Sequence, residues 1–303
     1  MDRRGAVCHK RADSVLDPSM PGISLPHVAM VLGAMFLIVA GDTAGKTMTG
    51  QGMNPFFVAW GRFALAALML APLAGLRRED LPAFLDWRLL LRTLFIVAGI
   101  CAILTALRTE PIANVFGAFF ISPVVSYFGS AAVLKERITV ARSVLLLIGF
   151  AGVLLVVRPG FGMTPGMGFA LFAGSCHGAY LVTTRWLAGA YRPRLLLLSQ
   201  LATGGLVLTP FALLHWPAEV SQGFAWAFPL SAFGSAMGNY LLVIASRTLP
   251  AGIVAPLVYA QIVAAMILGL VVFGDWPDSM ALAGLAVILA SGVAGLRLAG
   301  RGG

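Results

Sequence analysis

The chain has 303 residues, of which 59% are hydrophobic and 11% are charged, and its mean hydropathy is +0.91. A water-soluble domain of this length cannot bury so much apolar surface, so the composition excludes a soluble enzyme and indicates that lipid is the main solvent. The net charge of +9 is also found in nucleic-acid-binding proteins, and only the distribution of the basic residues separates the two classes.

The chain begins with a polar segment, residues 1–26, which we interpret as a cytoplasmic tail. It contains three prolines and lacks the short apolar core and cleavage site of a signal peptide. Met1 and Met20 are both candidate translation starts.

Ten apolar runs follow the tail, and most have about 18 to 23 residues, enough to cross a hydrocarbon core of about 30 Å as a helix. Helices are required because each unpaired backbone group in hydrocarbon costs several kcal/mol, and the alternating pattern of a barrel is absent. The expected spans are residues 27–47, 55–75, 89–107, 113–134, 140–157, 166–188, 195–214, 225–245, 251–273 and 279–296. The predicted fold class is therefore an all-α integral membrane protein with ten transmembrane helices.

The first half of the chain recurs weakly in the second half, at a shift of 138 or 139 residues. The matching elements are Arg108-Thr109-Glu110-Pro111 with Arg247-Thr248-Leu249-Pro250, Glu136 with Asp275, and Pro55 and Pro72 with Pro193 and Pro210. We predict one repeat over 27–157 and a second over 165–297. Each repeat holds five spans, and an odd number turns the second repeat upside down relative to the first. Inverted repeats are the architecture of alternating access, so the pattern indicates a transporter.

The basic residues are distributed unevenly between the two sides of the predicted membrane. With the N-terminus inside, seventeen Lys and Arg residues, Arg92 among them, fall on the cytoplasmic side and three on the other. This bias follows the positive-inside rule, so we expect both termini in the cytoplasm and no nucleic acid as a partner.

Three charged residues fall inside the first two spans, where each costs about 2.5 to 3.5 kcal/mol on insertion scales. Asp42 and Lys46 share one helix face, and Arg62 lies at a depth similar to that of Asp42. We expect an Asp42–Arg62 pair with Lys46 nearer the outer surface. Two roles are open for this pair. It either stabilises the first hairpin as a buried structural contact, or it faces a cavity, where it binds substrate or exchanges a proton. The repeat-equivalent residues are the uncharged Tyr180, Thr184 and Gln200, and this difference favours the functional reading.

Other polar residues inside the spans are candidates for a central pocket. His177 could carry protons near neutral pH or simply be hydrogen-bonded in the core. Aromatic walls with a few polar groups suit a small, partly polar organic molecule, although each residue alone could be a contact between helices. The uncharged candidates are Asn114, Ser122, Tyr180, Asn239, Tyr240, Tyr259 and Gln261.

Glu136 and Asp275 stand just before the fifth and tenth spans, where a carboxylate can cap a helix, and we interpret both as structural caps. The three cysteines are scattered without metal spacing, and no dinucleotide, phosphate-loop or catalytic motif is present. We therefore expect neither metal nor cofactor.

The ordered set of features resembles the drug/metabolite transporter superfamily, specifically its ten-helix members with two EamA domains. The features are the two halves joined at 158–165, Lys46 followed by Arg62, Pro111 opening the fourth span, and the parallel Pro250 and Asp275. Asp42-x-x-x-Lys46 with Arg62, and Pro256-x-x-Tyr259-x-Gln261, resemble a branch that carries S-adenosylmethionine and similar metabolites. Gln261 stands where such carriers often have an acid. The resemblance implies a central cavity lined mainly by spans 1, 3, 4, 6, 8 and 9.

We predict a secondary transporter of the bacterial inner membrane that moves a small polar or zwitterionic metabolite. Export of an amino acid or an amino-acid-derived compound such as a metallophore is favoured. Uptake of S-adenosylmethionine, riboflavin or a similar metabolite is the alternative, and an integral-membrane enzyme is a remote third. The predicted substrate-binding residues are Asp42, Lys46, Arg62, Asn114, Tyr180, Asn239, Tyr259 and Gln261, with Asp42 or His177 coupling protons.

Overall fold

The computed structural model describes residues 25–75, 78–135, 138–158, 163–187, 190–217, 226–248 and 257–299. Most of the predicted tail, residues 1–24, lies outside these ranges, and so does the predicted cap Glu136.

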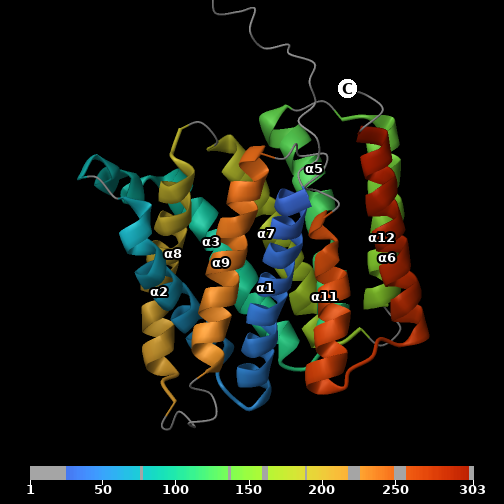
Figure 1. Ribbon diagram of the computed structural model, residues 1–303, viewed down its shortest axis with the longest axis horizontal. Coiled ribbons are helices and arrows are strands. Elements are labelled where there is room, and N and C mark those ends of the chain that lie inside the picture. The colour runs from blue at the N-terminus through green and yellow to red at the C-terminus, as the bar shows by residue number, and fades with distance from the viewer. Residues whose placement is uncertain are drawn as a thin grey trace, which may run out of the picture.

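Every regular element in the described ranges is a helix, and the long helices lie side by side in one bundle (Figure 1). The elements are α1 Leu25–Gly50, α2 Pro55–Ala74, η1 Arg78–Leu85, α3 Trp87–Leu107, α4 Ile112–Phe119, α5 Ser122–Leu134, α6 Val140–Val157, α7 Pro165–Trp186, α8 Pro193–Leu214, α9 Ala227–Thr248, α11 Ala260–Leu268, η3 Gly269–Phe273 and α12 Ser279–Ala299. Six helical stretches in these ranges are long and apolar enough to cross a membrane: residues 26–50, 55–72, 87–107, 112–134, 140–157 and 194–214. The all-helical membrane fold predicted from composition is confirmed.

The fourth predicted span is one apolar run in the sequence but two helices in the structure. α4 ends at Phe119, two residues form a turn, and α5 begins at Ser122. Pro123 lies in the first turn of α5 and has no N–H, so it cannot bond the carbonyl of Phe119. That carbonyl lies against Gly174 of α7, where an added Cβ would come within 2.5 Å of it. The break therefore depends on a glycine from the other repeat.

Repeat-equivalent helices pack against each other in opposite directions. Along α6 and α12, Gly149 faces Ser291 and Gly152 faces Gly284, so the residue number rises in one helix as it falls in the other. Along α2 and α8, the Phe56 ring stacks on Phe211 at 5.7 Å and Trp60 Nε1 donates to Thr209 Oγ1 at 3.1 Å. Because α12 is the counterpart of α6 and α8 that of α2, the two repeats are inverted, as the odd number of spans predicted.

An approximate twofold axis passes through the middle of the bundle. The rings of Phe120 and Tyr259 stack there, with centroids 4.9 Å apart and planes inclined by 24°. These residues are 139 positions apart and hold the same place in the two repeats. Their contact is therefore made between equivalent positions, which happens only on or near the symmetry axis.

Small residues let the helices of the two repeats approach closely. Gly41 of α1 meets α9 at Gly234, where an added Cβ would lie 2.5 Å from the Leu37 carbonyl oxygen. α3 and α7 form the equivalent crossing, in which Gly99 faces the Ala173 carbonyl. Each repeat thus packs its third helix against the first helix of the other.

The start of α1 and the end of α12 lie at the same end of the bundle, at the top of Figure 1. We call this the terminal end. The opposite end, where residues 51–54 join α1 to α2, is the hairpin end.

The capping role that we predicted for Asp275 belongs to Asp278. α12 begins at Ser279, so the residue directly before it supplies the cap, and Asp278 Oδ1 accepts the backbone N–H groups of Met280 and Ala281 at 3.1 and 2.9 Å. The Asp275 carboxylate instead accepts from Lys46 Nζ at 3.0 Å.

Replacing Gly234 by alanine should destabilise the protein by about 1–3 kcal/mol, because the new methyl group overpacks the crossing with α1. Gly33→Ala is the matched control, since nothing lies within 4 Å of a Cβ at that position of α1 and alanine is the better helix former. Thermal unfolding in detergent should show a lower midpoint for Gly234→Ala only. Equal midpoints for the two variants would contradict the close crossing.

The stabilisation from the Asp278 cap should depend on pH. The backbone N–H of Ala281, together with the Arg158 guanidinium, lowers the pKa of Asp278 below its ordinary value of 3.8. A lowered pKa in the folded state gives stabilisation that is complete above the unfolded-state pKa and is lost as pH falls through the folded-state pKa. Asp278→Ala should therefore cost about 1 kcal/mol at pH 7 and less near pH 3, measured by thermal unfolding. A cost that grows on acidification would refute this assignment.

Candidate functional site

A narrow cavity of about 60 Å³ lies between α2, α3, α7, α8 and α9. Its lining residues are Arg62, Phe63, Ala66, Ile96, Ile100, His177, Tyr180, Leu197, Gln200, Leu201, Ser235, Ala236 and Asn239. Several of them are repeat-equivalents: Arg62 with Gln200, Phe63 with Leu201, Ile96 with Ser235 and Ile100 with Asn239. The cavity therefore lies on the approximate twofold axis, and its second-repeat wall is the more polar one.

The predicted ion pair between Asp42 and Arg62 is present in the structure. Arg62 Nη1 donates to Asp42 Oδ1 at 2.5 Å, and both residues are 4% exposed. Arg62 also lines the cavity, and its Nε–H is buried without a partner among the described residues. A buried donor with no acceptor costs about 1–3 kcal/mol, so this guanidinium is only partly satisfied by Asp42.

The second repeat holds an uncharged version of the same pair. Tyr180 and Gln200 occupy the positions equivalent to Asp42 and Arg62, and the Tyr180 hydroxyl donates to Gln200 Oε1 at 2.9 Å. Both side chains line the cavity. The fold thus places a side-chain pair at the same point of each hairpin, charged in the first and neutral in the second.

Arg92 extends this second pair, and it is not the surface cation that the charge distribution predicted. We counted Arg92 with the cytoplasmic cations, yet it is 3% exposed and lies among α3, α7 and α8. It donates to Tyr180 Oη at 2.7 Å, to Thr184 Oγ1 at 2.8 Å and to the Leu196 carbonyl at 2.9 Å. Its guanidinium also lies 4.6 Å from the centre of the Tyr180 ring.

Helical spacing could have revealed Arg92. It lies three residues after Leu89, which is buried, and four before Ile96, which lines the cavity, so all three fall on one stripe of α3. The charge distribution alone predicted a surface position for Arg92, because this residue lies little more than one turn inside α3, which begins at Trp87.

His177 lines the cavity as predicted for a pocket residue, but it makes contacts typical of the core. Its Nδ1 is 2.8 Å from Ser122 Oγ, and its ring lies 4.9 Å from that of Phe119. Asn239, across the cavity, donates from Nδ2 to the Ser235 carbonyl at 2.7 Å.

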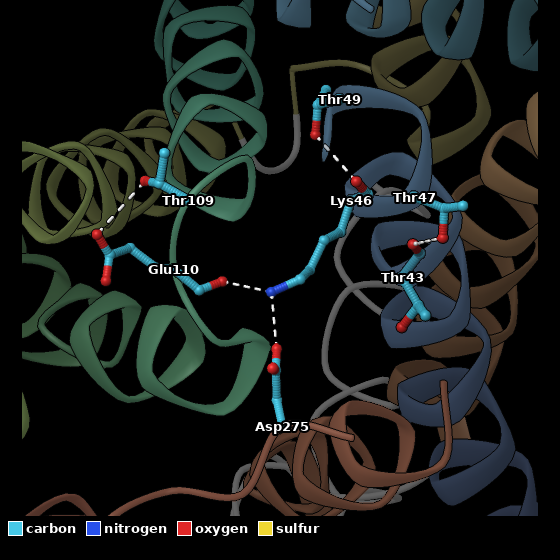
Figure 2. A network of polar contacts seen from close by, with 7 residues as sticks. All are labelled: Thr43, Lys46, Thr47, Thr49, Thr109, Glu110 and Asp275. Carbon is cyan, nitrogen blue, oxygen red and sulfur yellow. Dashed lines mark hydrogen bonds and ion pairs between the residues drawn. The ribbon is translucent and has the colours of Figure 1, made fainter. Parts of the chain in front are cut away.

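Lys46 does not line the cavity but bonds one residue of its own repeat and one of the other, near the hairpin end (Figure 2). Its Nζ donates to the Glu110 carbonyl at 2.6 Å and to Asp275 Oδ2 at 3.0 Å, and it lies 4.8 Å from the centre of the Phe273 ring. Glu110 was not among the predicted site residues; it is 9% exposed, and its carboxylate accepts from Thr164 Oγ1 at 2.5 Å. The Lys46–Asp275 bridge therefore connects α1 to the segment before α12.

The structure places three other candidates outside the lining of the cavity. Tyr259 stacks on Phe120 and lies against Gly292, and Gln261 is buried on α11. Asn114 Oδ1 is buried without a partner among the described residues. Of the predicted binding residues, Arg62, Tyr180 and Asn239 are brought together at the cavity, with Asp42 bonded to Arg62.

Two inverted helical repeats with a partly polar cavity on their axis are the architecture of a multi-pass membrane transporter. Residues 25–158 and 164–296 each match the EamA-like transporter family, and the chain belongs to that family.

Curated relatives cover nearly the whole chain at low identity. A riboflavin transporter from Rhizobium johnstonii is 24% identical over 91% of this chain and 94% of its own length. An S-adenosylmethionine uptake transporter from Rickettsia bellii is 24% identical over 88% of this chain and 93% of its own. A riboflavin transporter from Vibrio cholerae is 26% identical over 86% of this chain and 91% of its own length. A solved crystal structure with 17% identity and a TM-score of 0.64 covers 90% of this chain and shares its fold.

Removing one partner of the Asp42–Arg62 pair should be more harmful than replacing both. Arg62→Gln leaves a buried carboxylate unpaired and should lower stability by about 3–5 kcal/mol, whereas Asp42→Asn with Arg62→Gln should recover most of that loss. Thermal unfolding in detergent of the two single variants and the double variant provides the measurement. A double variant as unstable as the sum of the single variants would show that the two charges act independently.

Proposed function

We propose that this protein is a secondary transporter of the bacterial inner membrane and that it takes up a small polar metabolite. The observation that carries the proposal is the cavity on the axis between two inverted repeats, lined by Arg62, His177, Tyr180, Gln200 and Asn239. A central site shared by two inverted halves can face either side of the membrane in turn.

The relatives support uptake over export. The Rickettsia relatives are named as uptake transporters of S-adenosylmethionine, and others are named as riboflavin transporters. Both compounds join a nitrogen heterocycle to a polar tail. Aromatic side chains at Tyr180 and Phe63 and polar groups at Gln200 and Asn239 suit a molecule of that kind. We therefore replace the preference for export of an amino-acid derivative with uptake of a heteroaromatic or zwitterionic metabolite.

The cavity must widen during transport. Pockets for molecules of this size have volumes of about 300 Å³ or more, whereas this cavity has about 60 Å³. At the hairpin end the Lys46–Asp275 bridge joins the two repeats, and near the terminal end Arg92 joins α3 to α7 and α8. Breaking either set of contacts would open the cavity toward that end.

We further propose that the terminal end faces the cytoplasm, in keeping with the bias of basic residues toward that side. Asp42 is the proposed proton-coupling residue. It is a buried carboxylate whose charge is balanced by a cavity-lining arginine, so protonating it would release Arg62 toward the cavity.

Proteoliposomes test the proposed function even while the substrate is unidentified. Vesicles containing the purified protein, with an inward proton gradient, are incubated with a bacterial metabolite extract, with S-adenosylmethionine or with riboflavin. Mass spectrometry should find at least one polar metabolite enriched several-fold over protein-free vesicles. No enrichment of any metabolite, with or without the gradient, would refute the proposal.

Asp42→Asn should reduce that uptake at least 10-fold and remove its dependence on the proton gradient. The amide still accepts a hydrogen bond from Arg62 but no longer balances its charge, so the variant should insert into the membrane with lowered stability, and uptake is compared per amount of folded protein. Wild-type uptake by this variant would mean that Asp42 serves only to hold the first hairpin.

A further inference from the structure

Two guanidinium groups are tied to the cavity, but one carboxylate balances them. The lining residues and their hydrogen-bond partners in the described ranges include Arg62, Arg92 and a single acid, Asp42. Asp42 is bonded to Arg62. Arg92 bonds a phenol, an alcohol and a backbone carbonyl, all of which are neutral.

Neutral acceptors satisfy the donors of Arg92 without cancelling its charge. A buried charge is costly unless an opposite charge compensates it, and the described surroundings of this arginine leave the site with one positive charge in excess. The Nε–H of Arg62, which is buried beside the cavity, also lacks an acceptor among the described residues. Excess positive charge beside the cavity fits an anionic group on the transported molecule.

Arg62 lines the cavity and Arg92 does not, and the two arginines lie nearer opposite ends of the bundle. Arg62 is seven residues from the start of α2 at the hairpin end, about 10 Å along the helix, and Arg92 is five residues from the start of α3 at the terminal end, about 8 Å. Tyr180 links Arg92 to the cavity lining through one hydrogen bond. An anionic group could therefore meet Arg62 on entering from the hairpin end and Arg92 on leaving toward the terminal end.

We propose that the transported metabolite carries one carboxylate and that Arg62 and Arg92 bind this group in turn. The inference rests on the proposed function, and it narrows the substrate class to molecules with a single anionic group. A carboxylate accepts two parallel bonds from a guanidinium, which a neutral polar group cannot match. S-adenosylmethionine fits this requirement through its amino-acid moiety, whereas riboflavin has no carboxylate.

The test compares wild-type protein with Arg92→Gln and Arg92→Lys in proteoliposomes supplied with the metabolite extract. The matched control is Arg88→Gln, which removes the same charge one turn earlier on α3, where the side chain is exposed. We expect the enriched metabolites to carry a carboxylate, and Arg92→Gln to reduce their uptake at least 10-fold. Arg92→Lys should retain part of the activity, and Arg88→Gln should resemble wild type.

A second measurement uses wild-type protein alone, so it stands even if Arg92→Gln does not fold. The transported metabolite is compared with its decarboxylated or amidated analogue, with S-adenosylmethionine and its decarboxylated form as the first probe pair. Loss of the carboxylate should reduce uptake at least 10-fold.

Uptake of metabolites without an anionic group, equal uptake of a carboxylate and its amide, or wild-type uptake by folded Arg92→Gln would overturn the inference and leave the proposed function intact. If wild-type vesicles enrich nothing, both the proposed function and this inference fail.

Discussion

α2 lies against α8 and α6 lies against α12, each pair running in opposite directions, so the two repeats meet along an approximate twofold axis. The twofold axis determines the position of the central aromatic stack and of the cavity. Phe120 and Tyr259 stack because they are equivalent residues near the axis, and the cavity is lined by equivalent positions for the same reason. A site on such an axis presents nearly the same backbone to both sides of the membrane.

The side chains do not share the symmetry of the backbone. At corresponding points of the two hairpins, Asp42 and Arg62 form an ion pair whereas Tyr180 and Gln200 form a neutral hydrogen bond. Arg92 then adds a charge next to the neutral pair. The two repeats thus present different chemistry beside the cavity: an ion pair in the first, and a neutral hydrogen bond with a neighbouring arginine in the second.

The sequence predicted those features that follow from hydrophobicity and local spacing. The helical spans, the inversion of the repeats and the Asp42–Arg62 contact all rest on the length of apolar runs and on equal depth in a hairpin. The sequence could not show that Lys46 contacts Asp275, 229 positions away, because that contact depends on how the two repeats pack together. The sequence misplaced Arg92 because an arginine near the end of a span is usually drawn toward water, whereas hydrogen bonds to Tyr180, Thr184 and the Leu196 carbonyl hold this one inside.

Pro123 indicates the helix break between α4 and α5, but the sequence could not show which residue of the other repeat packs against that break. The free carbonyl of Phe119 is accommodated by Gly174, which belongs to the other repeat. The choice of Asp278 over Asp275 as the cap of α12 depended in the same way on a helix start that hydropathy locates only to within a few residues.

The crossing of α1 and α9 has a mechanical consequence. At Gly41 and Gly234 the two helices touch through backbone atoms, and one turn away the Ile38 side chain packs against Gly238. A backbone contact between small residues can act as a pivot, because little side-chain bulk opposes tilting at that point. Rocking about that point would swing the two ends of the helices in opposite senses, and Asp42, the neighbour of Gly41, would stay almost still at the fulcrum.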